Sequence, residues 1–243
     1  LGLGNQGGGT NRSSPVQISS PALSWSVVAC GDRHSCAIST AGTLWSTGFN
    51  LRGCLGQGDT TDRSNLTQIG SGTDWSKIAN GDSMSLAVKT NGTLWAWGNN
   101  GSGQLGQGNT TNRSSPVQVG ALTNWADVFA SSQTQTSIAL KTDGTLWSWG
   151  GAGAGSSGHG NTTSLSSPVQ IGSDTNWLRV SNTNNNCMGV KTNGEVWAWG
   201  NNWYEQLGLG DTSRTNQLSP VKVPDFKDVH DATCAYSHSR IIV

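Results

Sequence analysis

Short apolar segments alternate with polar turn residues along the whole chain, and they follow a fixed order. One complete set lies at 115–119, 124–128, 137–141 and 144–150, and we name these four segments A, B, C and D in chain order. Each is rich in β-branched or aromatic residues and is bounded by Gly, Asn, Asp, Ser or Pro, which is typical of short strands. No segment has the periodicity of an amphipathic helix. The pattern therefore predicts four strands per set.

Segment D carries the clearest repeat, a Gly-Thr-Leu-Trp motif or a close variant of it. Its glycines stand at 42, 92, 144 and 194, so they are 50, 52 and 50 residues apart. A period of this size is the signature of a repeat architecture. The Asn-Gly and Asp-Gly pairs before segment D supply the positive φ that a tight hairpin turn requires. We expect segments C and D to form a hairpin in every repeat.

The repeats predict an all-β fold, a β-propeller of four-stranded antiparallel blades with five repeats visible. We expect one domain over 1–243, with units at about 1–54, 55–104, 105–156, 157–206 and 207–243. Segment A recurs near Pro15, Leu66, Pro116, Pro168 and Pro220, and segment B is led by Trp25, Trp75, Trp125, Trp177 and, more loosely, Phe226. Segment C also occurs five times, but D occurs four times, so the last unit lacks its fourth strand. The blade number and the closure of the ring stay open.

Most of the tryptophans keep step with the repeat. One series is Trp25, Trp75, Trp125 and Trp177 in segment B, and a second is Trp45, Trp95, Trp147 and Trp197 in segment D. Because each blade is sandwiched between its neighbours, both faces of a strand can be apolar. We predict that both series lie in the core rather than serve light sensing or carbohydrate stacking.

Composition narrows the possible partners. The formal net charge is zero, and there is no run of Lys or Arg, so the chain lacks the electrostatic footprint of a nucleic-acid binder. It has no apolar run near the length of a membrane span. Its five cysteines fall at different places in the repeat and do not suggest a disulfide framework, although Cys30 and Cys36 could pair across a hairpin. We expect no nucleic acid, no membrane insertion, no metal and no cofactor.

Two stretches carry a resemblance to a known family. Gly92-Thr-Leu-Trp-Ala-Trp-Gly98, followed by Asn99-Asn-Gly-Ser-Gly-Gln-Leu-Gly106, resembles the repeat of the regulator-of-chromosome-condensation family, as does Gly31-Asp-Arg-His-Ser-Cys-Ala-Ile38. The resemblance covers the whole chain. It implies a β-propeller, commonly seven-bladed, whose members mostly bind other proteins.

The resemblance also ranks the possible functions. The founding member of the family is a nucleotide exchange factor that uses a β-wedge insertion and a basic tail. Here the repeat spacings vary by only a few residues and no basic tail is present, which argues against exchange activity. Simple repeats rich in Gly, Asn, Thr and Ser look more like the bacterial and bacteriophage branch of the family. We therefore expect a surface or virion structural component with an extracellular or virion-surface location.

Antiparallel alternation places the B–C and D–A connections at one end of every blade. These connections vary between repeats, whereas the A–B and C–D connections are nearly uniform, so the variable end is the candidate partner-binding face. The candidate residues on it are Arg33, His34, Leu51, Arg52, Met84, Trp203, Tyr204, Glu205 and Tyr236. Trp203 and Tyr204 replace Gly101 and Ser102 of the second repeat, and aromatic residues dominate interface hot spots; packing on the adjacent loop is the alternative.

No catalytic constellation stands out in the sequence. There is no repeated carboxylate pair with acid–base spacing and no evident set of Ser, His and Asp, and the glycine loops do not open a helix. We predict a non-enzymatic scaffold that binds a protein partner through the variable end. The alternatives are a lectin-like module that binds carbohydrate through Trp203 and Tyr204, and an enzyme with its site in the central channel.

Overall fold

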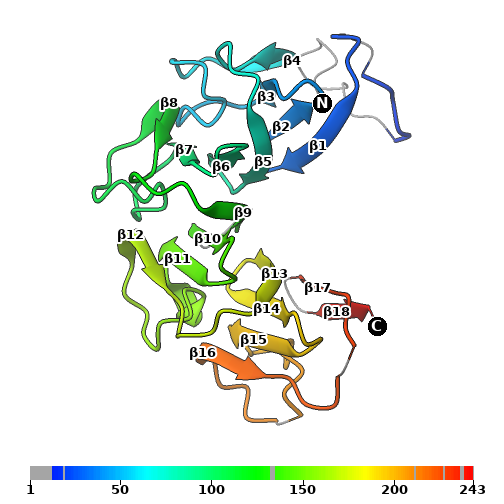
Figure 1. Cartoon of the computed structure of the whole chain (residues 1–243), viewed down its shortest axis with the longest axis vertical. Coiled ribbons are helices and arrows are strands. Elements are labelled where there is room, and N and C mark those ends of the chain that lie inside the picture. Colours follow the sequence, from blue (N-terminus) through cyan, green and yellow to red (C-terminus); the bar gives the residue numbers. More distant parts are fainter. Residues whose placement is uncertain are drawn as a thin grey trace.

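The computed structural model describes residues 13–18, 20–131, 135–210, 212–226, 228–235 and 238–242, and almost all of their regular structure is β (Figure 1). The first blade contains β1 (Trp25–Cys30), β2 (His34–Ser39), β3 (Leu44–Gly48) and β4 (Arg63–Gln68). The second contains β5 (Trp75–Asn80), β6 (Met84–Lys89), β7 (Leu94–Gly98) and β8 (Arg113–Gln118). The third contains β9 (Trp125–Ala130), β10 (Thr136–Lys141), β11 (Leu146–Gly150) and β12 (Leu165–Gln170). The fourth contains β13 (Trp177–Thr183), β14 (Asn186–Lys191), β15 (Val196–Gly200) and β16 (Gln217–Lys222), and a hairpin of β17 (Asp231–Cys234) and β18 (Ser239–Ile242) follows.

The four sheets confirm the predicted four-stranded antiparallel blades, but their boundaries are offset from the sequence repeats. In the first sheet the order is β1-β2-β3-β4, so segments B, C and D of one unit pair with segment A of the next. The same offset recurs in the other three sheets. Segment A is thus the outer strand of the preceding blade, and the chain then crosses from the outer edge of one blade to the inner edge of the next.

This offset corrects two expectations at the ends of the described chain. The described residues around Pro15, 13–18, form no strand, whereas each of the four segments A in the described sheets pairs with a segment D from the preceding unit. Phe226 does not lead the fifth segment B. Val229 does, since its backbone N–H reaches the Gly194 carbonyl as the Trp177 N–H reaches Gly144.

The blades follow one another around an open arc in the part of the chain that the structure describes, and their inner strands β1, β5, β9, β13 and β17 line its concave side (Figure 1). The single described helix is the three-residue turn η1 (Gly153–Gly155). None of the described helical structure is long and apolar enough to cross a bilayer.

The core lies between blades rather than within one sheet. One cluster joins Ile38 and Leu44 of the first blade to Trp75, Ile78 and Trp97 of the second, and the later pairs of blades repeat the arrangement. Burying large apolar side chains in this way supplies the main favourable term in folding. Consecutive blades therefore depend on each other for their cores, as in other repeat proteins.

The two predicted tryptophan series differ in burial. Trp75, Trp125 and Trp177 are buried as predicted, but Trp45, Trp95, Trp147 and Trp197 are only half-buried, because they lie near the end of the blade. The fully buried indoles of strand D are instead Trp97, Trp149 and Trp199. In the first blade the equivalent position is Thr47, and Trp25 is half-buried too.

The turns between segments C and D confirm the predicted role of glycine. Gly92 has a φ of +75°, a conformation that favours glycine over other residues. A Cβ atom at Gly92 would also collide with the Thr123 carbonyl oxygen of the neighbouring connection. Backbone geometry and close packing thus both require glycine at this turn.

Candidate protein-binding face

The variable connections lie together at one end of each blade. The Phe49 N–H, which opens the first D–A loop, donates a hydrogen bond to the Arg33 carbonyl of the B–C turn at 2.9 Å. The Asn201 N–H makes the same bond to the Asn185 carbonyl at 2.8 Å. The predicted grouping of these loops is therefore present, with the uniform A–B and C–D connections at the opposite end.

A buried asparagine gives most D–A loops a common frame. In the second blade the Asn100 Oδ1 accepts the Leu105 N–H at 2.9 Å, and its Nδ2 donates to the Asn109 and Thr111 carbonyls. Asn50 makes the equivalent bonds in the first blade. In the fourth blade Asn202 accepts the Leu207 N–H at 3.2 Å. Side chains that project from these loops therefore stand on an ordered backbone.

Trp203 and Tyr204 are the most prominent apolar side chains on the fourth D–A loop. They are 66% and 60% exposed. The Trp203 N–H donates to the Asn201 Oδ1 at 2.9 Å, and the Tyr204 N–H donates to the Gln206 Oε1 at 2.9 Å. The two aromatic residues are thus exposed on a loop whose backbone is held by hydrogen bonds.

Glu205 occupies a position that the other D–A loops give to glycine. Its φ is +59°, close to the values of Gly53, Gly103 and Gly155. Its carboxylate pairs with the Arg214 guanidinium at 3.1 Å on the exposed surface. A charged residue in a left-handed conformation costs free energy, and such exceptions cluster at functional sites.

The first blade adds a second group of exposed candidates. Leu51 is 60% exposed, and Arg52 beside it is also exposed. Arg33 forms an ion pair with Asp32 at 3.2 Å, and its guanidinium lies 5.7 Å from the centroid of the Phe49 ring. These contacts are exposed and weak, so Arg33 and Leu51 are accessible to a partner.

His34 and Met84 require correction, because both side chains point into the protein. The His34 Nε2 lies 3.1 Å from the Ser85 Oγ of the second blade, and burial lowers the pKa of His34 to about 4. Met84 is buried in the core between the second and third blades. Neither side chain belongs to the exposed face. Tyr236 lies outside the described residues.

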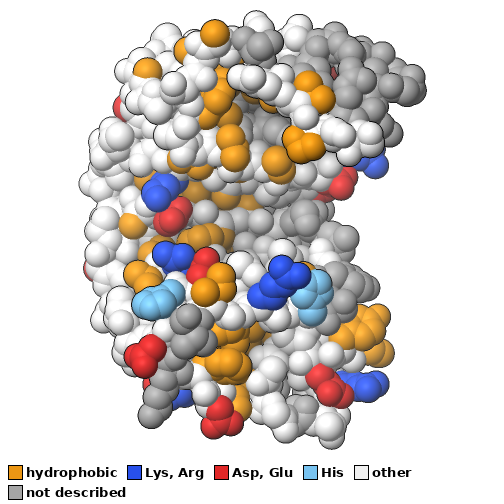
Figure 2. Space-filling model, turned by 90° about the vertical axis from the view of Figure 1, so that its right-hand side faces the viewer, with side chains coloured by type: hydrophobic (Ala, Val, Ile, Leu, Met, Phe, Trp, Pro, Cys, Tyr) orange, Lys and Arg blue, Asp and Glu red, His pale blue; other side chains and the backbone are white. Residues whose placement is uncertain are grey.

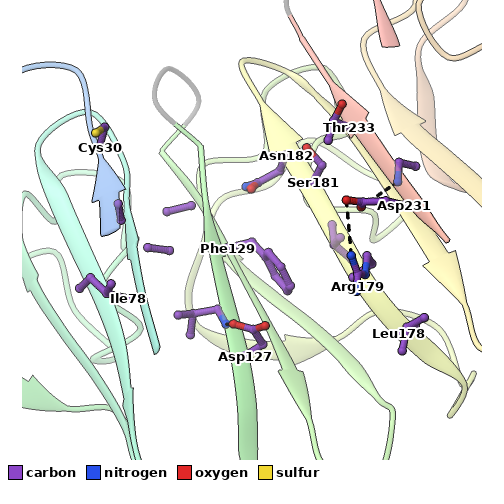
Figure 3. A pocket seen from close by; sticks show the side chains of 16 residues that line it. Cys30, Ile78, Asp127, Phe129, Leu178, Arg179, Ser181, Asn182, Asp231 and Thr233 are labelled. Atoms are coloured by element: carbon purple, nitrogen blue, oxygen red, sulfur yellow. Dashed lines mark hydrogen bonds and ion pairs between the residues drawn. The ribbon is translucent and has the colours of Figure 1, made fainter. Parts of the chain in front are cut away.

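A second candidate surface, which the sequence reasoning missed, lines the concave side of the arc. A cavity of about 590 Å³ there is bordered by the inner strands, as Figure 3 shows. Equivalent positions on successive inner strands carry Lys77, Asp127, Arg179 and Asp231. Lys77 pairs with Asp127 at 3.7 Å, and Arg179 pairs with Asp231 at 3.4 Å.

These ion pairs join neighbouring blades along the concave wall. Figure 2, which views the open side of the arc, shows basic and acidic side chains close together beside exposed apolar ones. The sequence signal for this wall is a charged residue two positions after Trp75, Trp125 and Trp177. The first repeat hides this signal because Val27 follows Trp25 at that position, and the fifth repeat hides it because Val229 replaces the tryptophan.

The described residues offer little reactive chemistry. Among them, no group of three His, Cys, Asp or Glu side chains could hold a metal ion. All five cysteines are free, and Cys30 faces Ser35 across the hairpin while Cys36 faces Ala29, so the two thiols are not cross-strand partners. Burial raises the pKa of Cys36 to about 12, which leaves it a protonated thiol at neutral pH.

Comparison with known proteins extends these observations. The model of the regulator of chromosome condensation (RCC1) repeat matches residues 1–38, 91–136 and 193–242. A second model of the same repeat matches residues 25–54 and 75–104. No curated protein matches the sequence.

Solved structures share the fold at low sequence identity. Human WBSCR16 has a TM-score of 0.79 at 20% identity, covering 90% of this chain and 59% of its own. Prp20p from Saccharomyces cerevisiae, studied for its binding to Gsp1p and histones, has a TM-score of 0.78 at 18% identity, covering 90% of this chain and 55% of its own. Yeast RCC1 (Prp20) bound to Kap60 has a TM-score of 0.77 at 18% identity, with 93% and 54% covered. The chain thus spans between half and two thirds of these relatives.

Proposed function

Because the chain belongs to the regulator of chromosome condensation repeat family, we propose that it is a non-enzymatic scaffold that binds a protein partner through its variable-loop face. The contact residues are Trp203 and Tyr204 on the fourth blade, with Glu205 beside them. Arg33, Leu51 and Arg52 extend the face on the first blade. We further propose that the scaffold serves a surface or virion assembly.

The exposure of Trp203 and Tyr204 on a hydrogen-bonded loop is the observation that supports this proposal most strongly. Large aromatic side chains that lie in solvent lose apolar hydration when a partner covers them. Because the loop backbone is already ordered, binding costs less conformational entropy than it would for a flexible loop. Tryptophan and tyrosine are also among the residues that carry most of the binding energy in protein interfaces.

The solved relatives are consistent with a protein partner. Prp20p was studied for its binding to Gsp1p and histones, and yeast RCC1 was solved with Kap60. Their sequence identity to this chain is 18%, so these structures support the same fold for this chain but do not identify its partner.

Site-specific photo-crosslinking tests the proposal. A photoreactive residue at Tyr204 should capture a discrete protein from extracts of the source organism, and Trp203→Ala should reduce that product about tenfold or more. The control places the same residue at Leu122, which is also exposed but lies on the uniform A–B connection at the opposite end. Equal capture at Leu122, or capture at Tyr204 that Trp203→Ala leaves unchanged, would contradict the proposal.

Carbohydrate binding is the second candidate, because exposed aromatic rings also stack on sugars. A glycan array probed with the wild type and with Trp203→Ala distinguishes the two functions. If glycan binding depended on Trp203 and no protein were crosslinked, the carbohydrate-binding function would be supported instead of the protein-binding function.

A further inference from the structure

The uniform end of the blades carries a second feature, which is independent of the variable-loop face. In three blades a lysine at the end of the second strand lies against the tryptophans of the first and third strands. The Lys89 Nζ is 4.8 Å from the Trp75 ring centroid and 4.9 Å from that of Trp95. Such distances allow cation–π attraction between an ammonium and an indole face.

The other two lysines repeat the arrangement. The Lys141 Nζ lies 4.9 Å from the centroid of Trp125 and 3.6 Å from that of Trp147. The Lys191 Nζ lies 4.9 Å from Trp177 and 3.8 Å from Trp197. In three blades, therefore, a pair of indoles in this arrangement contacts an alkylammonium group, which is the end of the lysine side chain.

The first blade has the pair of indoles without the lysine. Ser39 faces Trp25 across the hairpin, as Lys89 faces Trp75. The Trp25 and Trp45 rings are 6.3 Å apart at an interplanar angle of 88°. The three lysine-bearing pairs lie at 5.9 to 6.3 Å and 71 to 80°. The ring geometry is thus nearly the same with and without a lysine.

The hydrogen bonds around Ser39 hold this geometry. The Ser39 hydroxyl bonds to the Thr43 hydroxyl at 2.6 Å, and the Trp45 Nε1 donates to the Thr43 Oγ1 at 2.8 Å. Within the described part of the chain, no lysine or arginine nitrogen lies over either the Trp25 or the Trp45 ring. Both indoles are half-buried, so solvent reaches them.

The surroundings of this pair favour a cation with an apolar surface. Asp74 pairs with Lys89 at 3.1 Å, but the first blade has Ser24 at the equivalent backbone position. A primary ammonium would therefore lack a carboxylate for its N–H groups, whereas a quaternary ammonium needs none. Next to Trp25 lies an apolar cavity of about 490 Å³ bordered by Val16, Leu23 and Val28.

The first blade shares with the other three the pair of indoles at the uniform end, and it differs from them in having Ser39 where they have a lysine. We propose that Trp25 and Trp45 form a binding site for a quaternary or methylated alkylammonium group, such as choline or a methylated lysine side chain.

Titration with choline, followed by the indole N–H resonances of the ¹⁵N-labelled protein, tests the proposal. Choline should shift the Trp25 and Trp45 resonances saturably. The uncharged tert-butyl analogue of choline should bind about tenfold more weakly, because it lacks the cation–π term. Trimethyllysine and unmodified lysine, both as blocked amino acids, distinguish a methylated side chain from a primary ammonium as the source of the cation.

Ser39→Lys is the decisive variant, because it supplies the first blade with the lysine that the other blades have. It should fold and lower the affinity for choline at least about tenfold by filling the site from within. Trp45→Leu should have a similar effect by removing one ring. Unchanged choline shifts in Ser39→Lys, shifts confined to other tryptophans, or equal binding of the neutral analogue would each overturn the proposal.

Discussion

The Trp97 indole Nε1 donates a hydrogen bond to the Cys54 carbonyl at 2.8 Å and thereby joins the second blade to a loop of the first. Trp149 and Trp199 make the same bond to Gln104 and Ser156, at 2.8 and 3.0 Å. Each bond satisfies a buried donor while the ring fills the space between blades. These three indoles therefore set the contact between consecutive blades.

Trp97→Ala should lower the free energy of unfolding by roughly 3 to 5 kcal/mol, since it leaves a cavity between two blades and removes one of the two hydrogen bonds that the Cys54 carbonyl accepts. Trp203→Ala removes an exposed ring and should cost less than about 1 kcal/mol. Urea denaturation of the two variants measures both values. Similar losses in the two variants would show that the inner and outer tryptophans have been assigned wrongly.

Gly92→Ala should destabilise the protein more than Gly70→Ala. Both glycines have positive φ, so both substitutions cost about 1 kcal/mol in backbone strain. Gly92→Ala also forces a Cβ atom onto the Thr123 carbonyl oxygen, whereas nothing lies within 4 Å of a Cβ at Gly70. Thermal and chemical denaturation should show that the free energy of unfolding of Gly92→Ala is lower than that of Gly70→Ala by about 1 kcal/mol or more. If the two variants were equally stable, the close packing of this turn would have to be rejected.

Acidification should weaken the junction between the first and second blades. His34 has a pKa of about 4 in the folded protein, mainly because burial disfavours its charged form, against an ordinary value of 6.5. The unfolded chain therefore binds the proton more readily, and the stabilisation is complete above pH 6.5 and is lost as the pH falls toward 4. The loss amounts to roughly 3 kcal/mol.

The variant His34→Gln isolates this effect, because it keeps a polar side chain near Ser85 without the titration. Urea denaturation between pH 7 and pH 4 should show a smaller loss of stability in His34→Gln than in the wild type. Parallel pH profiles in the two proteins would mean that His34 does not titrate as a buried group.

Lys141 and Lys191 should respond differently to replacement by methionine. Both contact two indoles, but Lys191 also pairs with Asp174 at 2.7 Å, and burial lowers the pKa of Lys141. Lys141→Met relieves the cost of burying a charge and should leave stability within about 1 kcal/mol of the wild type. Lys191→Met loses an ion pair as well and should be less stable than Lys141→Met by about 0.5 kcal/mol. Equal unfolding midpoints of the two variants would show that the ion pair with Asp174 adds no stability at Lys191.

Much of the fold could be predicted, because glycine and tryptophan mark the same positions in every repeat. The turn at Gly92 and the burial of Trp75 both followed from local rules. The membership of segment A could not be predicted, because a short edge strand carries no signal that tells which neighbouring sheet it joins. The burial of Trp95 was overestimated because alternation assigns a face of the strand but not a depth within the blade.

The candidate face was predicted less completely than the fold. Trp203 and Tyr204 could be found because they break the glycine-rich pattern of their loop. His34 and Met84 were misplaced, because the sequence does not show where the turn ends and the strand begins, and both are the first residues of their strands. The charges at Lys77 and Asp127 required an alignment of the repeats by strand register, which is not evident from the tryptophans alone.

The pairing of each outer strand with the preceding repeat also determines how the chain could be divided. A cut at the exposed residues Thr110 and Thr111 in the loop between β7 and β8 would leave one fragment containing three strands of the sheet and another beginning with the strand that completes it. The two pieces would present matching hydrogen-bonding edges to each other. The exposed end of this loop, just before β8, is therefore a natural place to split the protein into halves that reassemble.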